Sequence, residues 1–553
     1  MEYTGAEIII KTLIDEGVDT LFGYPGGAVI DIYNALYNYR DQIRHIRPSH
    51  EQGGAHAADG YSRSTGKTGV VLATSGPGAT NLVTGIATAY MDSIPMVCIT
   101  GNAASHLIGK DAFQEIDIFG ATMSVTKHNF MITDIADLQD TIRRAFKIAN
   151  SGRKGPVLID VPKDFTQLKY PYEKKESLPI DGKHKIVQSD LEKFAEIINQ
   201  AERPIIYAGG GINSSDSSQE LRALMDKAMI PAVNTIMAIG VLGPLDQLNL
   251  GMVGMHGKNS SNYSIEHSDL VIALGTRFSD RVALNTKHFA PDAKIIQVDI
   301  DQSEIDKNVV VDFEIVGDLK EILAEILSLI EEKDRKDWLA QIEEFRKEDY
   351  QPPNGSDSIE PYKIIRHVAE YFGEDLIFVT DVGQHQMWTA QYCARTKPRT
   401  FLTSGGLGTM GFGFGASIGA KAGNPDKPVV LISGDGSFTM NMNELKTAVD
   451  HQINTITIIL NNHALGMVRQ WQNLLYDQRY SETDIDHSFD YVKLAEAFGA
   501  KGYSCATITE FKAAFADATT QNKPIIIEAI IDKDELVLPM IPAGGTVEDI
   551  IME

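Results

Sequence analysis

Two stretches decide the fold of the last third of the chain: Val429-Val-Leu-Ile-Ser-Gly-Asp-Gly-Ser437 and Thr455-Ile-Thr-Ile-Ile-Leu-Asn-Asn462. Each is a short apolar run of strand length that ends in a polar turn, and the segment 443–451 between them is compatible with a helix. A strand–helix–strand unit makes its two strands parallel, so their carboxyl ends lie at the same edge of a sheet. We therefore expect Asp435 and Asn462 to lie side by side.

Apolar runs of strand length alternate with amphipathic stretches along the whole chain. This alternation predicts an α/β protein with three doubly wound parallel-sheet domains. Polar stretches at about 168–186 and at 351–357 are expected to be linkers, which places the domains at 1–167, 187–345 and 360–553. The apolar runs are Gly69–Thr74, Pro95–Thr100, Pro156–Asp160, Pro204–Tyr207, Leu270–Leu274, Ile377–Thr380, Val429–Ile432, Thr455–Leu460 and Pro524–Glu528.

The first and last parts of the chain contain similar segments. Residues 70–81 read VVLATSGPGATN and residues 429–441 read VVLISGDGSFTMN, each a strand followed by Ser-Gly-X-Gly and a helix start. Internal similarity at this separation predicts two domains of one topology. The alternative is that any two strand–glycine turn–helix units look alike.

Composition excludes several classes of function. A hydrophobic content of 43% and a charged content of 23% are ordinary for a soluble globular protein, and 553 residues are too many for one core. The net charge of −25 argues against nucleic acid as a partner, because a polyanion would be repelled. The three widely spaced cysteines form no CxxC pair, and the sequence shows neither a signal peptide nor a long apolar run. We expect a cytoplasmic protein that makes no membrane contact.

The turn chemistry around Asp435 and Asn462 suits a metal-bound phosphate. A carboxylate, an amide oxygen and a nearby backbone carbonyl are ligands that Mg²⁺ prefers when it also takes phosphate oxygens. The glycines let the backbone approach a diphosphate, and a helix start adds N–H donors. The alternative is an ordinary glycine turn with an aspartate cap.

Gly434-Asp435-Gly436 together with Asn461-Asn462 resembles the diphosphate motif of thiamine-diphosphate enzymes. The resemblance implies that Asp435, Asn462 and the main-chain oxygen of Ala464 bind Mg²⁺, in a last domain that holds the diphosphate. Cofactor contacts carried over by motif are Tyr24, Pro77, Asn81, Gly383, Gln384, His385, Gly408, Met410, Gly434, Gly436, Ser437 and Met467.

Glu51 is the candidate for the carboxylate that activates the cofactor. It begins a stretch of small residues, Gly53-Gly-Ala-His-Ala-Ala58, that suits a closely packed helix. On its own, Glu51 is better explained by complementing a helix N-terminus, worth ~0.3–1 kcal/mol. The surrounding HEQGGAHAADGYSR resembles the family's glutamate segment, which implies that Glu51 faces the pyrimidine ring from the first domain. Met410 matches the bulky residue that bends the cofactor, the alternative being a gap-filling core methionine, and Pro77 shows that the first domain has no metal ligand at the equivalent turn.

Seven further motifs resemble acetohydroxyacid synthase nearly letter for letter: FGYPGG (22–27), TSGPGATN (74–81), DAFQE (111–115), GMHG (254–257), RFSDRV (277–282), GMVRQWQ (466–472) and VLPMIPAG (537–544). The resemblance implies that Arg281 pairs with the carboxylate of a second 2-keto acid. It also implies that Trp471 narrows the pocket to favour 2-ketobutyrate, and that Phe113, Gln114 and Lys163 lie near the reacting centre. Arg281 as an exposed cation and Trp471 as a core aromatic are the alternatives.

A glycine-rich turn, Tyr207-Ala-Gly-Gly-Gly211, follows a strand in the middle part. Such a turn is weak evidence for a dinucleotide, and it could be a packing device. The family resemblance implies a structural FAD here, although catabolic relatives lack it, and Asp299 would be a ribose or adenine partner. The positions concerned are Arg153, Gly209, Gly210, Thr235, Met255, His256, Gly257, Arg277, Asp299 and Asp318.

The resemblance thus implies an enzyme that decarboxylates pyruvate and condenses the two-carbon unit with pyruvate or 2-ketobutyrate. The products, 2-acetolactate and 2-aceto-2-hydroxybutyrate, are precursors of valine, leucine and isoleucine. It further implies a homodimer or homotetramer with the site at a subunit interface, and a separate small regulatory subunit. The alternatives are an FAD-dependent pyruvate oxidase and a catalytically silent homologue.

Overall fold

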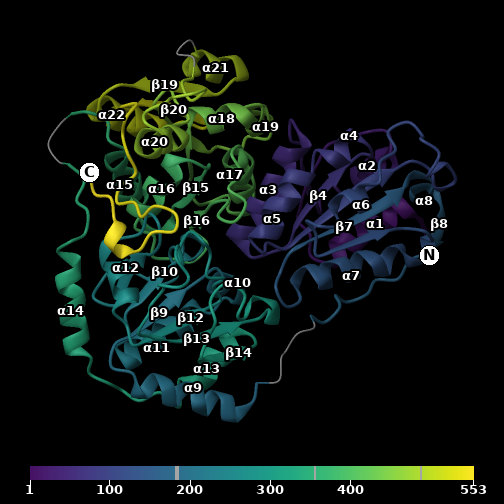
Figure 1. Ribbon diagram of the computed structural model, residues 1–553. Helices are drawn as coiled ribbons and strands as arrows, with labels where there is room; N and C mark the ends of the chain where they lie inside the picture. Colours follow the sequence, from purple (N-terminus) through teal and green to yellow (C-terminus); the bar gives the residue numbers. More distant parts are fainter. Residues whose placement is uncertain (181–185, 354–356, 486–488) are drawn as a thin grey trace.

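The computed structural model describes residues 1–180, 186–353, 357–485 and 489–553. Within these ranges the strands form three six-stranded parallel sheets and one two-stranded ribbon. Figure 1 shows the first sheet and its helices beside the third, with the middle unit below the third. The predicted α/β class with three doubly wound sheets is confirmed.

The first sheet has the strand order β3-β2-β4-β5-β7-β6. Its strands are β2 (Thr20–Gly23), β3 (Arg44–Ile46), β4 (Gly69–Ala73), β5 (Met96–Asn102), β6 (His128–Met131) and β7 (Pro156–Pro162). Its helices are α1 (Gly5–Asp15), α2 (Ile30–Leu36), α3 (Glu51–Thr65), α4 (Pro77–Thr80), α5 (Val83–Met91), α6 (Ile118–Thr122), α7 (Leu138–Asn150) and α8 (Lys163–Gln167).

The middle sheet has the order β11-β10-β9-β12-β13-β14, which is the dinucleotide-fold order with the first strand at the centre. Its strands are β9 (Pro204–Ala208), β10 (Ala232–Asn234), β11 (Asn249–Met252), β12 (Leu270–Leu274), β13 (Lys294–Asp299) and β14 (Phe313–Val316). Its helices are α9 (Gln188–Gln200), α10 (Gly211–Ser215), α11 (Ser218–Ala228), α12 (Asn259–Glu266), α13 (Leu319–Ile326) and α14 (Lys336–Arg346).

The third sheet has the order β16-β15-β17-β18-β20-β19. Its strands are β15 (Ile377–Thr380), β16 (Phe401–Leu402), β17 (Val429–Gly434), β18 (Ile456–Asn461), β19 (Lys501–Cys505) and β20 (Ile525–Ile530). Its helices are α15 (Pro361–Phe372), α16 (Gln384–Tyr392), α17 (Phe412–Gly423), α18 (Asp435–Asn441), α19 (Glu444–Asp450), α20 (Gly466–Leu475), α21 (Tyr491–Phe498) and α22 (Ile508–Ala518).

The first and third sheets have the same topology. If the strands of each are numbered in chain order, both sheets run 2-1-3-4-6-5 across. The two similar segments found in the sequence occupy equivalent places, because β4 and β17 are both third in their sheets. The expectation of two domains of one topology is confirmed.

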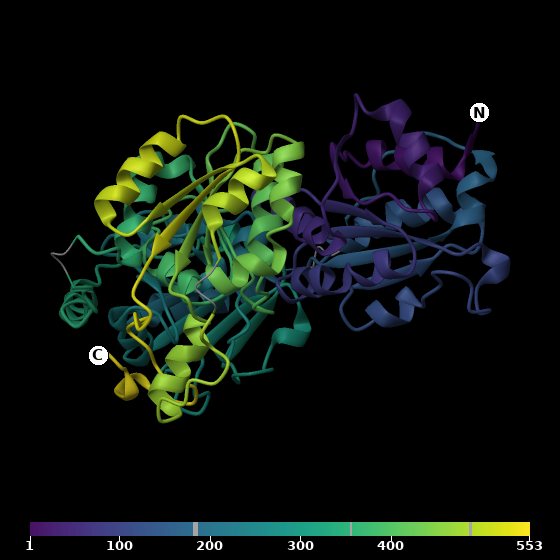
Figure 2. The same ribbon diagram turned by 90° about the horizontal axis from the view of Figure 1, so that it is seen from above.

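The first and third units share one hydrophobic core. Helix α3 packs against α17, so that side chains from both helices and from both sheets belong to a single buried cluster. The helices approach so closely that a Cβ on Gly60 would overlap the carbonyl group of Ala416, and one on Gly419 would overlap that of Ala57. Figure 2 shows the two units joined along this line. The small residues around Gly53 therefore serve close packing, as the sequence indicates.

A buried ion network reinforces this junction. The Arg63 guanidinium on α3 pairs with Asp59 and with Asp92, the latter at 2.8 Å, and also donates to the carbonyl oxygen of Thr403 at 2.8 Å. Asp92 in turn accepts the backbone N–H groups of Gly405 and Gly406 at 3.1 and 2.7 Å. The stretch before α17 is thus held by charged groups of the first unit.

The segment expected to be the first linker begins as part of the first unit. Strand β8 (Lys169–Pro171) pairs antiparallel with β1 (Glu2–Thr4), and Tyr172 is buried in the same core as α1. The pairing extends the ordered unit beyond residue 167, because a backbone partner at the start of the chain was not visible in the polar sequence. Residues 181–185 and 354–356, in the two expected linkers, lie outside the described residues.

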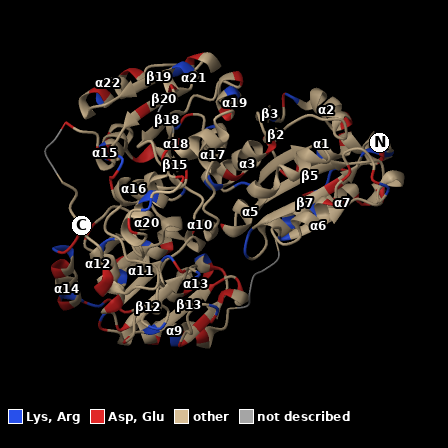
Figure 3. Cartoon of the chain, turned by 45° about the horizontal axis from the view of Figure 1, so that its top comes forward, with Lys and Arg blue, Asp and Glu red and all other residues tan. Residues whose placement is uncertain are grey.

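The exposed acidic residues fit the negative net charge, and the free cysteines fit the absence of a disulfide pattern in the sequence. Acidic residues are spread over exposed helices such as α13, α14 and α22 (Figure 3). Cys98, Cys393 and Cys505 are all free and buried. In the part of the chain that the structure describes, no helix is both long enough and apolar enough to span a membrane.

Candidate functional site

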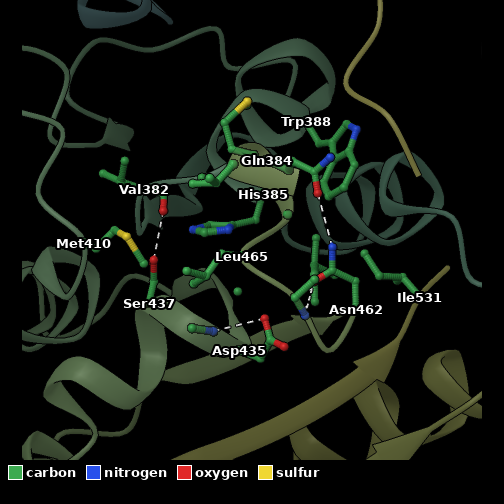
Figure 4. Close-up of a pocket in the computed structure, with 18 residues that line it drawn as sticks. Val382, Gln384, His385, Trp388, Met410, Asp435, Ser437, Asn462, Leu465 and Ile531 are labelled. Carbon is green, nitrogen blue, oxygen red and sulfur yellow. Dashed lines mark hydrogen bonds between the residues drawn. The ribbon is translucent and has the colours of Figure 1, made fainter. Parts of the chain in front are cut away.

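A pocket opens at the carboxyl edge of the third sheet, where β15, β17 and β18 end (Figure 4). Asp435 and Asn462 both line it, which confirms that the two lie at one edge. Its described lining comes from the third unit alone, between residues 382 and 531. The lining residues are Val382, Gly383, Gln384, His385, Trp388, Met410, Gly434, Asp435, Gly436, Ser437, Leu460, Asn462, Ala464, Leu465, Gly466, Met467, Val468 and Ile531.

The Asp435 carboxylate has one oxygen with no protein partner. Its Oδ1 accepts the N–H of Gly436 at 3.0 Å, whereas Oδ2 is buried and makes no hydrogen bond of ordinary geometry within the described residues, although the N–H groups of His463 and Ala464 lie near the carboxylate. Burial raises the pKa of Asp435 to about 6. A buried carboxylate oxygen without a partner calls for a ligand or a cation. No cluster of three His, Cys, Asp or Glu side chains that could hold a metal exists in the described chain, so a cation here would also need amide and backbone oxygens.

Asn462 supplies such an oxygen and is held in place by glutamines. Its Oδ1 accepts the N–H of Ala464 at 3.2 Å, and its amide group donates to Gln384 Oε1 at 3.2 Å. Gln384 also donates to Gln470 at 2.9 Å. Oxygen donors of Asp435, Asn462 and the Ala464 backbone thus gather in one pocket, a set that fits Mg²⁺.

Three helices begin at the pocket. Helices α16, α18 and α20 start at Gln384, Asp435 and Gly466, and each start contributes to the lining. Helix N-termini carry free N–H donors and partial positive charge, so they favour an anion such as a diphosphate. At Gly383, the residue that precedes α16, φ is +150°, a conformation that glycine adopts readily.

His385 and Gly434 meet on the pocket wall. A Cβ on Gly434 would lie 2.8 Å from His385 Nδ1, so the turn after β17 needs glycine. Burial lowers the pKa of His385 to about 3, which keeps its ring neutral, and Nε2 is buried without a partner in the described chain. The ring therefore offers a neutral polar atom rather than a charge.

Met410 lines the pocket beside a firmly held backbone. The N–H of Gly411 donates to Asp381 at 2.7 Å, and the carbonyl oxygen of Gly411 accepts from Asn441 at 2.7 Å. Ser437 donates its hydroxyl to the carbonyl oxygen of Val382 at 2.8 Å across the pocket (Figure 4). These bonds fix the loop that carries Met410. Gly408 does not line the pocket but precedes Met410 in this loop, with φ of +68°.

Glu51 lies in the first unit, outside this pocket. It is the first residue of α3, and its Oε2 accepts the amide of Asn81 at 3.0 Å. A Cβ on Gly78 would lie 3.3 Å from the other carboxylate oxygen, so the turn around Pro77 closes over Glu51. The structure brings Glu51, Pro77 and Asn81 together, apart from Asp435 and Asn462 of the same chain.

The segment 103–117 lies against the turn around Pro77. Glu115 accepts the N–H groups of Gly109 and Ala112, and these bonds lower its pKa. Gln114 has φ of +59° and packs against Gly76, where a Cβ would lie 2.9 Å from the Gln114 Cβ. Phe113 is 89% exposed. Three further predicted residues stay near the surface: Tyr24, Lys163 at the start of α8, and Trp471 on α20.

The C-terminal segment ties the pocket to the middle unit. The carbonyl oxygen of Glu535 accepts from Gln384 at 2.8 Å, and the N–H of Ile541 donates to the carbonyl oxygen of Met255 at 2.8 Å. The N–H of Met255 in turn donates to the carbonyl oxygen of Arg281 at 2.9 Å. The Arg281 side chain is 62% exposed, with Asp280 at 4.0 Å, so it is not committed to a strong ion pair within the described chain.

Several of the predicted FAD positions have structural tasks of their own. Arg153 pairs with Glu304 at 2.7 Å, and Asp318 caps α13. A Cβ on Gly209 would overlap the carbonyl group of Gly275, so that turn also serves close packing.

Other FAD positions keep unused polar groups. The hydroxyl of Thr235 is buried with no partner among the described residues, and burial raises the pKa of Asp299 to about 6. His256 lies against the carbonyl oxygen of Pro539 at 3.3 Å, and burial lowers its pKa to about 4. The remaining positions, Gly210, Gly257 and Arg277, lie in turns beside the strands of the middle sheet. These groups fit a bound polar molecule only in part.

Comparison with known proteins assigns all three units. The N-terminal TPP binding domain, central domain and C-terminal TPP binding domain of thiamine pyrophosphate enzymes match residues 3–121, 191–326 and 381–529. The chain belongs to the thiamine pyrophosphate enzyme family. Within it, the chain is 47% identical to a probable acetolactate synthase large subunit of Methanocaldococcus jannaschii, over 99% of this chain and 95% of that protein.

Two bacterial relatives extend the comparison. Acetolactate synthase large subunits of Corynebacterium glutamicum and Haemophilus influenzae are 44% and 41% identical, each over 99% of this chain and over 90% and 98% of their own length. The chain is thus a member of the acetolactate synthase large-subunit group of thiamine pyrophosphate enzymes, and the predicted family resemblance is confirmed.

Sequence reasoning missed part of this thiamine pyrophosphate enzyme's pocket. Leu465 packs over Gly436, where a Cβ would lie 2.7 Å from Leu465 Cδ2, and Gln470 links Gln384 to the backbone of Val537. Their positions next to Asn462 and Trp471 in the chain were the available signal. Trp388 and Ile531 gave none, because they look like ordinary core residues.

Proposed function

We propose that the chain is the catalytic subunit of an acetohydroxyacid synthase. It decarboxylates pyruvate and condenses the two-carbon unit with pyruvate or 2-ketobutyrate, which gives 2-acetolactate or 2-aceto-2-hydroxybutyrate for valine, leucine and isoleucine biosynthesis. The observation that carries the proposal is the third-unit pocket, where an unpartnered Asp435 oxygen, Asn462 and three helix N-termini converge. The large-subunit relatives along nearly the full chain support the choice of reaction.

The cofactor site would be filled by thiamine diphosphate and Mg²⁺. Asp435, Asn462 and the Ala464 carbonyl would hold the metal ion, because they present hard oxygen donors. The helix starts at Gln384 and Gly466 would donate N–H groups to the diphosphate. When bound, thiamine diphosphate supplies the nucleophilic carbon and the electron sink that decarboxylation of a 2-keto acid requires.

The protein side of the reaction is positioning and proton control. Glu51 would face the pyrimidine ring and hold a proton there, with its Oε2 oriented by Asn81. Met410 would contact the cofactor from its anchored loop. The neutral His385 ring would add no charge of its own beside the metal ion and the diphosphate.

The second substrate would be selected by exposed groups around the pocket. The free Arg281 guanidinium suits a bidentate contact with a keto-acid carboxylate. Trp471, on the helix whose start lines the pocket, would narrow the space for the second substrate. Recognition of one methylene is worth ~1–3 kcal/mol, so preference rather than exclusion is expected. Phe113, Gln114 and Lys163 would complete the wall.

The active unit would be at least a homodimer. Glu51 belongs to the first unit, whereas the described pocket is lined by the third unit alone. A second copy, in a dimer or tetramer, would bring its own Glu51 to this pocket. The relatives are large subunits, which supports a separate small regulatory subunit as a further partner. Three free, buried cysteines support the expected cytoplasmic location.

FAD would have a structural role in the middle unit. The unpartnered Thr235 hydroxyl and the dinucleotide-fold strand order support this part of the proposal. Flavin absorbance of the purified protein, measured before and after denaturation, tests it without any assay of activity. A colourless protein that takes up no added FAD would contradict it.

The reaction is tested by incubating the purified chain with pyruvate, thiamine diphosphate and Mg²⁺, with and without 2-ketobutyrate. We expect acetohydroxy acids, detected as acetoin or its homologue after acid treatment, and no reduction of an added dye. Dye reduction without acetoin would indicate a pyruvate oxidase. No turnover of either kind, by a folded protein that binds the cofactor, would indicate a silent homologue. In the same assay, Glu51→Gln should abolish condensation while cofactor binding persists.

A further inference from the structure

Glu444, the first residue of α19 in the third unit, contacts the segment of the first unit that precedes Glu51. Its side chain is 1% exposed. Oε1 accepts the backbone N–H of His50 at 2.9 Å, and Oε2 accepts that of Ser49 at 3.1 Å. Both donors are main-chain groups immediately before the first residue of α3, so this carboxylate contacts the backbone that leads into Glu51.

The remaining hydrogen bonds hold the carboxylate itself. Thr447 donates its hydroxyl to Oε2 at 2.7 Å, and Asn443 donates its amide to Oε1 at 3.2 Å. None of these four donors is a cation, so Glu444 is not half of an ion pair in the described contacts. Burial raises the pKa of Glu444 to about 7, and the nearby Glu51 carboxylate adds to the rise. Two of its four hydrogen bonds therefore go to the backbone just before α3 and two to side chains of its own region.

Gly53 shows that the fit is close. A Cβ on Gly53, in the first turn of α3, would overlap the Glu444 carboxylate, so any larger residue there would have to displace that side chain. His50 caps α3 by accepting the N–H of Gln52 at 3.1 Å. The start of α3 is thus held from inside by His50 and from the neighbouring unit by Glu444.

His451, directly after α19, contacts the backbone of the same segment. The N–H of Arg47 donates to the ring of His451 at 2.9 Å, and Arg47 lies 3.4 Å from Asp450 at the surface. Three backbone donors between residues 47 and 50 therefore end on side chains of one short region. That region directly follows α18, which begins with the pocket residue Asp435.

We propose that Glu444 is a positioning residue for Glu51. By accepting the N–H groups of Ser49 and His50, it fixes the start of α3 and thus the direction in which the Glu51 carboxylate faces. The inference rests on the proposed function, in which that carboxylate faces the cofactor.

Glu444→Gln tests the inference, because an amide replaces one acceptor oxygen by a donor. Whichever way the amide turns, either Ser49 N–H or His50 N–H then faces another donor. In the cofactor-free protein we expect amide hydrogen exchange of peptides covering residues 47–52 to become about 10-fold faster, the equivalent of one lost hydrogen bond. In the loaded enzyme kcat should fall about 10²-fold, the effect of a small misplacement. The KM for pyruvate and the affinity for thiamine diphosphate should stay unchanged.

Gly53→Ala probes the same contact from the other side, since the added methyl group displaces the carboxylate. It should reproduce both changes. Asp450→Asn is the matched control, because this partly exposed carboxylate of the same helix contacts the segment only through the exposed Arg47 side chain and accepts none of the backbone N–H groups of residues 47–50. Its exchange pattern and its kcat should equal those of the parent.

Unchanged exchange at residues 47–52 in Glu444→Gln, or faster exchange with unchanged kcat, overturns the inference. So does an equal loss of kcat in Asp450→Asn. If the parent enzyme itself makes no acetohydroxy acid, the proposed function fails. The exchange comparison in cofactor-free protein still decides whether Glu444 holds the start of α3.

Discussion

At the scale of single residues, buried carboxylates organise the loops around the site. Asp160, at the end of β7, accepts the hydroxyl of Thr100 at 2.7 Å and the amide of Asn102 at 2.5 Å. Asn102 in turn accepts the N–H of Ala103 at 2.7 Å. This chain of bonds anchors the start of the segment 103–117 that carries Gln114. Burial raises the pKa of Asp160 from 3.8 to about 6.

Asp160→Asn should change how stability depends on pH. A carboxyl with a raised pKa binds its proton more tightly in the folded state, so its stabilising contribution is full below pH 3.8 and is lost as the pH rises through about 6. The variant lacks this contribution. The unfolding free energy of the parent minus that of the variant should therefore decrease between those two pH values and level off above. Urea unfolding across this range measures it, and a difference that rises with pH contradicts the assignment.

Residues of the site divide into those that a pattern reveals and those that it does not. Asp435 and Asn462 follow apolar strands, so topology alone brings them together. Glu51 needed its resemblance to a family segment. Glu444 and Asp160 left no signal, because their partners are far away in sequence and a buried carboxylate inside an ordinary helix or strand looks like a surface charge.

At the scale of elements, α3 and α17 are joined by two similar contacts. α19 of the third unit holds the segment before α3, and the end of α5 in the first unit holds the segment before α17. In the first contact Ser49 meets Thr447 at 3.1 Å, and in the second Thr88 meets Thr409 at 2.8 Å, each hydroxyl to hydroxyl. The start of α3, with Glu51, and the loop with Met410 are thus each held by hydrogen bonds from the other unit.

Gly419→Ala should weaken this joint. A methyl group would overlap the carbonyl group of Ala57, and overpacking of this kind costs about 1–3 kcal/mol, more than the gain from better helix propensity. Equilibrium unfolding in urea measures the loss. Gly27→Ala is the control, because a Cβ there meets no atom within 4 Å. A Gly419→Ala protein as stable as the parent would show that the helices can separate at no cost.

The strands that could be predicted from the sequence are the buried ones. All nine apolar runs expected to be strands match β4, β5, β7, β9, β12, β15, β17, β18 and β20, four of them extending one residue beyond the strand, and most are fully buried. Edge strands such as β6 (His128–Met131) and β19 (Lys501–Cys505) were not expected, because one exposed face and polar residues remove the apolar run. β8 depends on a partner at the start of the chain, which no local pattern encodes.

At the scale of the whole molecule, the separation of Glu51 from the pocket predicts complementation between two inactive chains. A Glu51→Gln chain has an intact third unit, and an Asp435→Ala chain has an intact first unit. A dimer with one copy of each would contain one site with both groups, so isolated mixed dimers should show about half the parent activity, as two-fold symmetry requires.

Two differently tagged copies allow the mixed dimer to be purified and compared with each inactive parent variant. Absence of activity in a cofactor-bound mixed dimer would place both groups in one chain.

Three doubly wound parallel sheets could be expected from the sequence. The packing of one unit on another could not, because the surfaces in contact, such as α3 and α17, consist of small residues without a distinctive pattern.

The shared strand order of the first and third sheets has an evolutionary consequence. Equivalent helices, α3 before β4 and α17 before β17, face each other across the joint, as the same helix of two identical molecules would across a two-fold axis. A homodimer whose gene was duplicated and fused around the middle unit would have this architecture. The two units differ at the equivalent turn, where Pro77 stands in the first and Asp435 in the third, so only the third has a carboxylate there that could hold a metal.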